Sequence, residues 1–208
     1  MTPNQFIGKS GKICALLFNQ IPKLTAPGCP IMDRRYLFTG KPGLAKSAIA
    51  EMLGRALVTH ELGIEALNGQ SCSVDRIRDW QFHGRFAPMF GMRVQIVDEI
   101  DAASPAAHNE LRTYLDRLPA KTVFIGTTNR TVEDLPEQLQ SRFKILYFDP
   151  LPIELISEWL QAKFPRLGAA MAGSIAIQSN GNVRAAETVA LSVADNWVES
   201  LEQEVVLA

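Results

Sequence analysis

The sequence predicts an α/β protein in which a five-stranded parallel sheet lies between helices, followed by a small all-helical domain. Up to about residue 148, five short apolar runs alternate with segments of helical periodicity. Such alternation is typical of a parallel sheet that is covered on both faces. After residue 149, apolar residues recur only at helical spacing. Two such sets are Ile153, Ile156, Leu160 and Phe164, and Val183, Ala186, Ala190, Val193 and Trp197. We therefore expect two domains, residues 1–148 and 149–208.

The expected strands are short apolar segments bounded by turn residues. They comprise residues 35–39, 64–67, 93–97, 122–126 and 144–148. The first strand runs directly into a glycine-rich loop, and apolar residues at helical spacing follow over residues 46–58. The first 34 residues contain several helix-breaking residues, namely Pro22, Pro27, Gly28 and Pro30. No long element is predicted there.

Capping residues indicate where three further helical segments begin. Ser73 is the expected N-cap of the helix after the second strand. Ser104 followed by Pro105 predicts a helix over residues 106–118, because proline is favoured at the first helical position. Thr131 begins a pattern that resembles a capping box before a short helical turn.

Composition favours a folded protein without an extreme charge. The chain has 208 residues, 47% of them hydrophobic, and a formal net charge of −1, which argues against bulk disorder. Residues 149–208 hold 8 acidic and 3 basic residues, so the first part is basic and permits a basic binding face. The three cysteines form no C-x-x-C pair, and no apolar run approaches the about 18 residues that span a membrane. We expect a cytoplasmic protein with reduced thiols and no membrane partner.

The loop after the first strand matches the phosphate-binding pattern G-x-x-x-x-G-K-[ST] except at its second glycine. It consists of Gly40, Lys41, Pro42, Gly43, Leu44, Ala45, Lys46 and Ser47. In such a loop, backbone N–H groups and a helix N-terminus face phosphate oxygens. Lys46 is expected to reach the β- and γ-phosphates, and Ser47 to bind Mg²⁺. Taken alone, an ordinary strand-to-helix turn is the alternative interpretation.

Two adjacent carboxylates, Asp98 and Glu99, end the third expected strand. In an open parallel sheet, the carboxyl ends of neighbouring strands lie beside the loop that follows the first strand. Asp98 is therefore a candidate Mg²⁺ ligand, and Glu99 is a candidate general base for the attacking water. A solvated strand end is the alternative, but it does not explain why the pair follows a phosphate loop by about 50 residues.

The order of these motifs resembles that of the AAA+ ATPases, and within them the clamp-loader and Holliday-junction-helicase branch. Residues 126–129 (GTTN) resemble the sensor strand of the family, residues 141–143 (SRF) the Ser-Arg-Cys motif of clamp loaders, and residues 181–184 (GNVR) the second sensor. Asn68 stands where the family often has a polar residue that restrains the catalytic glutamate. The resemblance covers nearly the whole chain and implies a P-loop NTPase fold with a helical lid, ATP and Mg²⁺ as cofactors, and ATP hydrolysis.

The resemblance also implies roles for single residues. Asn129 would lie near the γ-phosphate and the attacking water, as a catalytic residue beside Lys46 and Glu99. Arg184 would contact the nucleotide from the lid. Arg142 corresponds to an arginine that acts in trans on the γ-phosphate bound by a neighbouring subunit, so it implies a ring or spiral oligomer. Within residues 4–8, Ile7 and Gly8 resemble the segment that packs on the adenine. A turn asparagine or a solvated arginine is the structural alternative for a single match.

Three features depart from the clamp-loader pattern. Ala45 replaces a glycine, which costs little in a helix-like backbone but is strained at positive φ; a similar Gly-Leu-Ala-Lys loop is typical of the MoxR branch. Phe143 replaces the clamp-loader cysteine. The chain stops about where the third, collar domain of a clamp-loader subunit would begin, so we expect a departure from the standard clamp-loader role.

The resemblance implies an oligomeric ATPase that uses hydrolysis to drive conformational change on DNA or on a DNA-bound protein assembly. Four arginines near the helix that begins at Ser73 are consistent with salt-dependent contacts to a duplex backbone: Arg76, Arg78, Arg85 and Arg93. A solvated helix face explains them equally well. Two alternative functions remain, a MoxR-like protein-remodelling ATPase and an ATP-binding assembly switch with weak hydrolysis.

Overall fold

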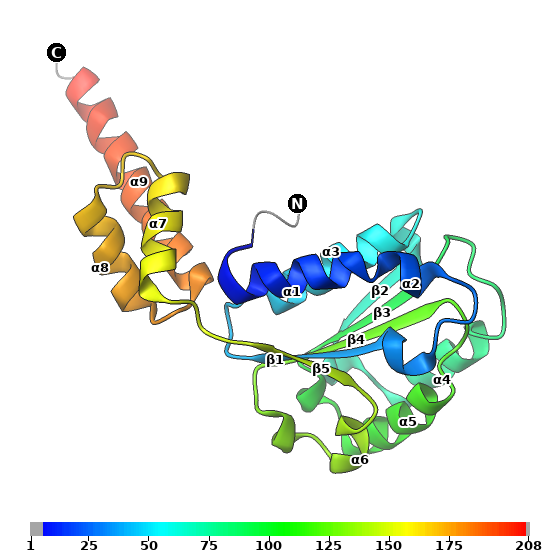
Figure 1. Ribbon diagram of the computed structural model, residues 1–208. Coiled ribbons are helices and arrows are strands. Elements are labelled where there is room, and N and C mark those ends of the chain that lie inside the picture. Colours follow the sequence, from blue (N-terminus) through cyan, green and yellow to red (C-terminus); the bar gives the residue numbers. More distant parts are fainter. Residues whose placement is uncertain (1–5, 207–208) are drawn as a thin grey trace.

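A five-stranded parallel sheet forms the centre of the computed structural model, which describes residues 6–206, with side chains as far as residue 194 (Figure 1). The strand order is β2-β3-β4-β1-β5. The strands are β1 Arg35–Gly40, β2 Ile64–Asn68, β3 Arg93–Asp98, β4 Thr122–Thr128 and β5 Lys144–Phe148. All neighbouring pairs are parallel. The predicted fold class and the five predicted strands are therefore confirmed.

Helices cover both faces of the sheet (Figure 1). One face carries α1 Gly8–Asn19, α2 Ile21–Thr25 and α3 Lys46–Leu57, and the other carries α4 Val74–His83, α5 Pro105–Asp116 and α6 Glu137–Gln140. Successive strand residues point to opposite faces, so Phe38 packs in the first layer and Leu37 in the second. Both are fully buried. The interior strand β1, which lies between β4 and β5, is thus packed on both faces, and this fixes the loop at its end.

The capping residues identified in the sequence begin the helices as predicted. The Ser73 hydroxyl accepts the N–H of Arg76 at 3.2 Å, and the Ser104 hydroxyl accepts the N–H of Ala107 at the same distance. A capping box starts at Thr131, before a short 3-10 helix over Val132–Asp134. Short 3-10 turns also occur at Ile31–Arg34, Glu61–Gly63, Gly69–Ser71 and Ile100–Ala102.

Helix α1 was not predicted. It begins without a side-chain cap and has no acidic residue in its first turn, so the local signals for a helix start are missing. Its stability comes from burial of Ile13, Cys14 and Leu17 against the sheet, because tertiary packing stabilises most helices in proteins. Residues 4 and 5 of the segment compared with the adenine-binding region lie outside the described residues.

Three C-terminal helices follow β5: α7 Ile153–Lys163, α8 Ala169–Ser179 and α9 Val183–Val206. They lie beside the sheet layers (Figure 1) and enclose a core of their own. Ile156, Leu160 and Ala186 of the predicted apolar sets are fully buried in that core, while the side chain of Trp197 lies outside the described part. Within the described residues, no helix combines the length and the apolar character that a membrane crossing requires.

Candidate functional site

Residues 40–47, here called the phosphate loop, join the carboxyl end of β1 to α3. The backbone bends through positive φ at Gly40 (145°), Gly43 (80°) and Ala45 (64°). A Cβ at Gly40 would overlap the carbonyl of Phe148 on β5, so glycine is required there. Ala45 is left-handed rather than helix-like, and this conformation costs an L-residue about 1–2 kcal/mol. The loop therefore stores strain at the position where the motif normally has glycine.

Lys46 is buried beneath the loop, and all three protons of its ammonium group have acceptors. The Nζ atom donates to the carbonyls of Gly40 at 2.7 Å and Lys41 at 2.8 Å, and to Oδ1 of Asn129 at 2.8 Å. Burial lowers the pKa of Lys46 to about 8, while nearby Asp98 opposes the shift. A buried cation whose hydrogen-bond partners are all neutral favours an added anion such as a phosphate.

Ser47, Asp98 and Thr127 form the next part of the site. The Ser47 hydroxyl donates to Oδ1 of Asp98 at 2.7 Å, and the hydroxyl of Thr127 on β4 donates to the same oxygen. Within the described residues, no group of three or more His, Cys, Asp or Glu side chains is arranged to hold a metal ion. Mg²⁺ commonly binds through one or two protein oxygens together with phosphates and waters. The pair Ser47 and Asp98 fits that kind of site.

Glu99 lies directly after β3 and has positive φ (53°). Its carboxylate accepts hydrogen bonds from two amide groups, Nδ2 of Asn129 at 3.0 Å and Nδ2 of Asn68 at 3.4 Å. Because Asn129 also accepts from Lys46, it links the carboxylate to the ammonium group. The ends of β1, β2, β3 and β4 thus bring the predicted residues Lys46, Asp98, Glu99 and Asn129 into one hydrogen-bonded network at the carboxyl edge of the sheet.

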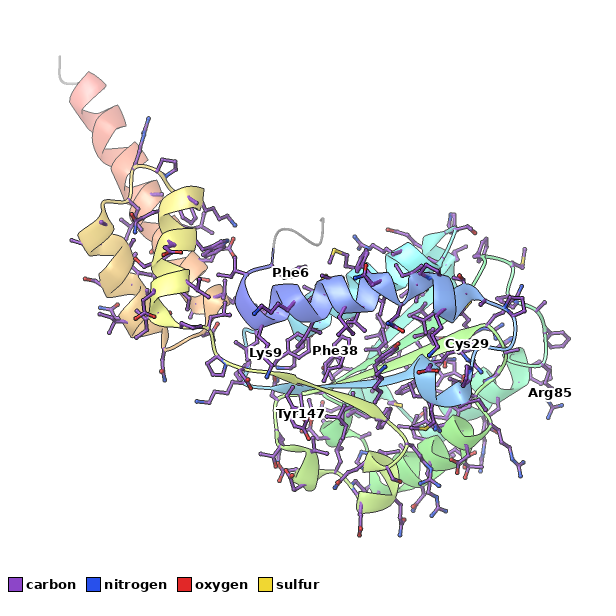
Figure 2. The ribbon with its side chains drawn as sticks, viewed as in Figure 1. Phe6, Lys9, Cys29, Phe38, Arg85 and Tyr147 are labelled. Carbon is purple, nitrogen blue, oxygen red and sulfur yellow. The ribbon has the colours of Figure 1, made fainter. Side chains whose placement is uncertain are left out.

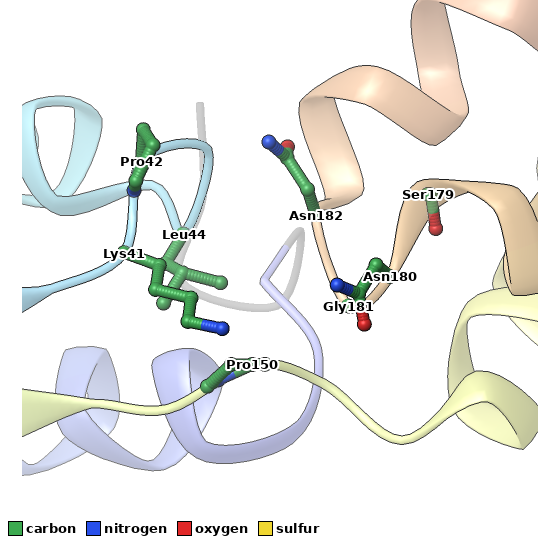
Figure 3. Close-up of a pocket in the computed structure, with 8 residues that line it drawn as sticks. All are labelled: Lys41, Pro42, Leu44, Pro150, Ser179, Asn180, Gly181 and Asn182. Atoms are coloured by element: carbon green, nitrogen blue, oxygen red, sulfur yellow. The ribbon is translucent and has the colours of Figure 1, made fainter.

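A cavity of about 170 Å³ separates the phosphate loop from the C-terminal helices (Figure 3). Its lining residues are Lys41, Pro42, Leu44, Pro150, Ser179, Asn180, Gly181 and Asn182. Asn182 reaches the loop, since a Cβ at Gly43 would overlap its amide group. Arg184 is exposed at the start of α9, and its charge contributes to lowering the pKa of Lys46. Arg184 follows Asn182, which lines the cavity, by two residues, but Arg184 is not itself among the lining residues.

Ile7 and Gly8 join the N-terminal segment to the C-terminal helices. Ile7 packs against their core, and a Cβ at Gly8 would overlap Leu151. The neighbouring residue Lys9 forms an ion pair with Asp149 at the end of β5. Ile7 and Gly8 are not among the residues that line the 170 Å³ cavity, so their contact with a base remains a prediction.

Arg142 lies at the amino ends of the parallel strands, here called the amino edge of the sheet, whereas the phosphate loop lies at their carboxyl ends. Arg142 precedes β5 by two residues, whereas the phosphate loop follows the carboxyl end of the parallel strand β1. A strand of five or six residues is about 17–20 Å long, so the structure does not bring Arg142 to the loop of its own chain. Arg142 instead pairs with Oδ2 of Asp116 at 2.7 Å and donates to the carbonyl of Gln138.

The arginines around α4 are less available than the sequence indicates. Arg76 lies 3.4 Å from a carboxylate oxygen of Glu65, Arg78 faces a carboxylate on its own helix, and Arg93 donates to a backbone carbonyl. Figure 2 shows Arg85 pointing outward at the end of the molecule farthest from the C-terminal helices. Because neighbouring carboxylates offset part of this charge, α4 alone is a weak case for a DNA-binding surface.

Three residues that shape the site were not assigned a role from the sequence. Thr127 donates to Asp98 and also accepts the backbone N–H of Glu99 at 3.2 Å. Asn182 accepts the N–H of Ala185 at 3.0 Å and so caps α9; its place just before an apolar helical pattern is a signal that could have revealed it. Asp116 offered no signal, because its partner Arg142 is 26 residues away.

Comparisons with known proteins agree with the fold and give its family. The family model described as "ATPase family associated with various cellular activities (AAA)" matches residues 36–151. Replication factor C subunit 4 of Encephalitozoon cuniculi is 29% identical over 128 residues, covering 60% of this chain and 41% of the relative. The replication factor C small subunit of Methanocella arvoryzae is 32% identical over 121 residues, covering 55% and 37%. The chain thus spans about two fifths of the length of these curated relatives.

Among solved structures, the RuvB Holliday junction branch migration motor of Thermotoga maritima has a similar fold. Its TM-score is 0.69 at 21% identity, and the match covers 91% of this chain and 62% of the RuvB chain. The match to the family model includes β1 from its second residue on, the phosphate loop and the two carboxylates at the end of β3, and it extends over more than half of the chain. The chain belongs to the AAA family of ATPases.

Proposed function

We propose that the protein binds ATP together with Mg²⁺ and hydrolyses it as a subunit of a ring or spiral oligomer. The observation that carries the proposal is the network of Lys46, Asn129 and Glu99, which joins a buried cation to a carboxylate beside Ser47 and Asp98. A protein that only binds a nucleotide needs the cation and the Mg²⁺ ligands, but a hydrolase also needs a carboxylate that can accept a proton from water.

Each residue has a distinct task in the proposed reaction. Lys46 binds the β- and γ-phosphates and balances the charge that develops on them. Glu99 accepts the proton of the attacking water, and Asn129 orients both Glu99 and the γ-phosphate. Ser47 and Asp98 would hold Mg²⁺, which supplies further positive charge to the phosphates when bound. The remaining residues of the phosphate loop contribute backbone N–H groups, since a loop ending at a helix N-terminus favours anions.

The γ-phosphate site is completed, in this proposal, by Arg142 of a neighbouring subunit. Its position at the amino edge of the sheet supports action in trans, because the loop of the same chain lies at the other edge. In this proposal, Arg184 contacts the bound nucleotide from the C-terminal helices. Hydrolysis then changes this contact and with it the angle between these helices and the sheet. We further propose that the chain divides at residues 148 and 149 into an ATPase domain and a lid, as their separate cores suggest.

The partner on which the cycle acts is DNA or a DNA-bound protein assembly. This part of the proposal is supported by the names of the relatives, a replication factor and a Holliday junction motor, rather than by the arginines of α4. We also place the protein in the cytoplasm, consistent with three cysteines that are all free thiols.

Steady-state ATP turnover of the wild type, Glu99→Gln and Arg142→Ala tests the proposal, with nucleotide affinity measured in parallel. Loss of the proton acceptor is expected to lower kcat by about 100-fold or more, while ATP binding persists. If Glu99→Gln binds ATP tightly and turns it over at the wild-type rate, the proposed hydrolase is contradicted and the assembly switch with weak hydrolysis is favoured. Stimulation by duplex DNA that disappears at high salt supports the DNA partner, whereas a rate unaffected by DNA favours a protein remodeller.

A further inference from the structure

Asp116 stands between two arginines at the amino edge of the sheet. As the last residue of α5, it lies with Oδ2 at 2.7 Å from Nη2 of Arg142 and with Oδ1 at 3.8 Å from Nη1 of Arg35. Each carboxylate oxygen thus faces a different guanidinium group. The two arginines come from separate strand ends, so Asp116 connects the start of β1 to the start of β5.

Arg35 is the buried member of this cluster. Only 5% of Arg35 is exposed, and its Nη1 atom donates to the carbonyl of Leu115 at 2.8 Å. The adjacent residue Asp116 therefore lies beside a guanidinium group that is buried and hydrogen-bonded to the same helix. Burial lowers the pKa of Arg35, and the negative charge of Asp116 opposes that shift, as expected when a carboxylate favours the charged form of a buried base.

The side chain of Arg142 is fixed at several points. Besides Asp116, its Nη1 atom contacts the carbonyl of Gln138 and the hydroxyl of Ser141, the latter at 3.4 Å. Its side chain is 23% exposed, against 48% for Asp116. A free arginine samples many rotamers, and these contacts select one of them. Two guanidinium groups and one carboxylate leave a net positive charge on this edge, so the ion pair holds Arg142 without cancelling the charge of the cluster.

We propose that Asp116 is a positioning residue for Arg142. Supported by Arg35, it fixes the guanidinium group of Arg142 at the amino edge of the sheet, where a second copy of this chain would present its nucleotide. The inference rests on the proposed action of Arg142 in trans. An arginine that stabilises a transferring phosphoryl group must be placed accurately, because a displacement of about 1 Å can cost about 100-fold in rate.

The test compares kcat and KM for ATP in Asp116→Asn, Asp116→Glu and Arg142→Ala, measured on the assembled protein. Asp116→Asn keeps the size of the side chain and removes its charge, so kcat is expected to fall about 10- to 100-fold, while KM stays within about twofold because Asp116 does not touch the nucleotide site. Asp116→Glu keeps the charge, so its kcat should lie between those of Asp116→Asn and the wild type. In an Arg142→Ala background, Asp116→Asn should cause no further loss.

Asp33→Asn is the matched control, because it removes the charge of another ion pair, 2.9 Å from Lys23, and should leave kcat unchanged. If Arg142→Ala lowers kcat but Asp116→Asn and Asp116→Glu both turn over like the wild type, the role of Asp116 is refuted and the trans arginine stands. If Asp116→Asn lowers kcat equally with and without Arg142, Asp116 acts on the fold instead. If Arg142→Ala itself keeps full turnover, the proposed action of Arg142 in trans is refuted, and the role of Asp116 is refuted with it.

Discussion

A methyl group added at Gly43 should disturb both the phosphate loop and the helix that faces it. Gly43 has φ of 80°, and a Cβ there would lie well inside 3.0 Å of the Asn182 amide, a separation that real Cβ atoms essentially never show. The same amide oxygen accepts the N–H of Ala185 and caps α9. Gly43→Ala therefore strains the loop and displaces a helix cap in one step.

The expected cost follows from these two contacts. A left-handed alanine costs about 1–2 kcal/mol, and loss of an N-cap costs about 1 kcal/mol. Alanine has less conformational freedom than glycine in the unfolded chain, and this offsets about 0.4–1 kcal/mol of the loss in stability. The free energy of unfolding should thus fall by about 2 kcal/mol, which lowers the Tm of a chain of this size by about 4–8 °C.

Gly28→Ala is the matched control, because Gly28 has φ of 78° and a Cβ added there would meet no atom within 4 Å. It carries the same backbone strain without the clash, so urea unfolding should separate the two variants by about 1 kcal/mol. In an Asn182→Ala background that difference should vanish. Equal stabilities of Gly43→Ala and Gly28→Ala with Asn182 present would refute the packing of Asn182 on the loop.

Two further predictions concern buried polar groups. The pKa of Lys46 is lowered to about 8 from 10.5, so the unfolded chain holds more protons between these values, and stability should rise with pH across that window. Bound phosphate favours the charged form of Lys46, so ATP binding should take up a proton and should weaken above about pH 8. Calorimetry in buffers of different ionisation enthalpy measures this proton uptake. Lys46→Arg should abolish the uptake, because arginine stays charged over this range. Tyr114→Phe removes the 2.6 Å hydrogen bond to fully buried Gln95, and should cost about 1–3 kcal/mol in chemical denaturation; a wild-type midpoint would contradict that.

The sheet could be predicted from the sequence because buried parallel strands appear as apolar runs and because serine caps mark helix starts. All five strands and the caps Ser73 and Ser104 agree with the structure. Helix α1 could not be predicted, since it lacks a cap and depends on burial against strands that lie far away in the sequence. Local propensity carries little information about such a helix.

The site was predictable where motif order fixed the strand ends, as for Lys46, Asp98, Glu99 and Asn129. The backbone of Ala45 was not, because its left-handed φ results from closure of the loop between β1 and α3 rather than from the residue itself. The pairing of Arg142 with Asp116 joins two elements that no motif connects. Contacts of this kind depend on tertiary packing.

The central claim is that a working site takes Glu99 from one subunit and Arg142 from the next. Mixing equal amounts of Glu99→Gln and Arg142→Ala chains tests it most directly, by ATP turnover of the assembled mixture. Each variant alone should be nearly inactive. Random assembly pairs an intact Glu99 with an intact neighbouring Arg142 at about one quarter of the interfaces, so turnover should return to about one quarter of the wild-type rate. A mixture no more active than the mean of its two parts would contradict a site shared between subunits.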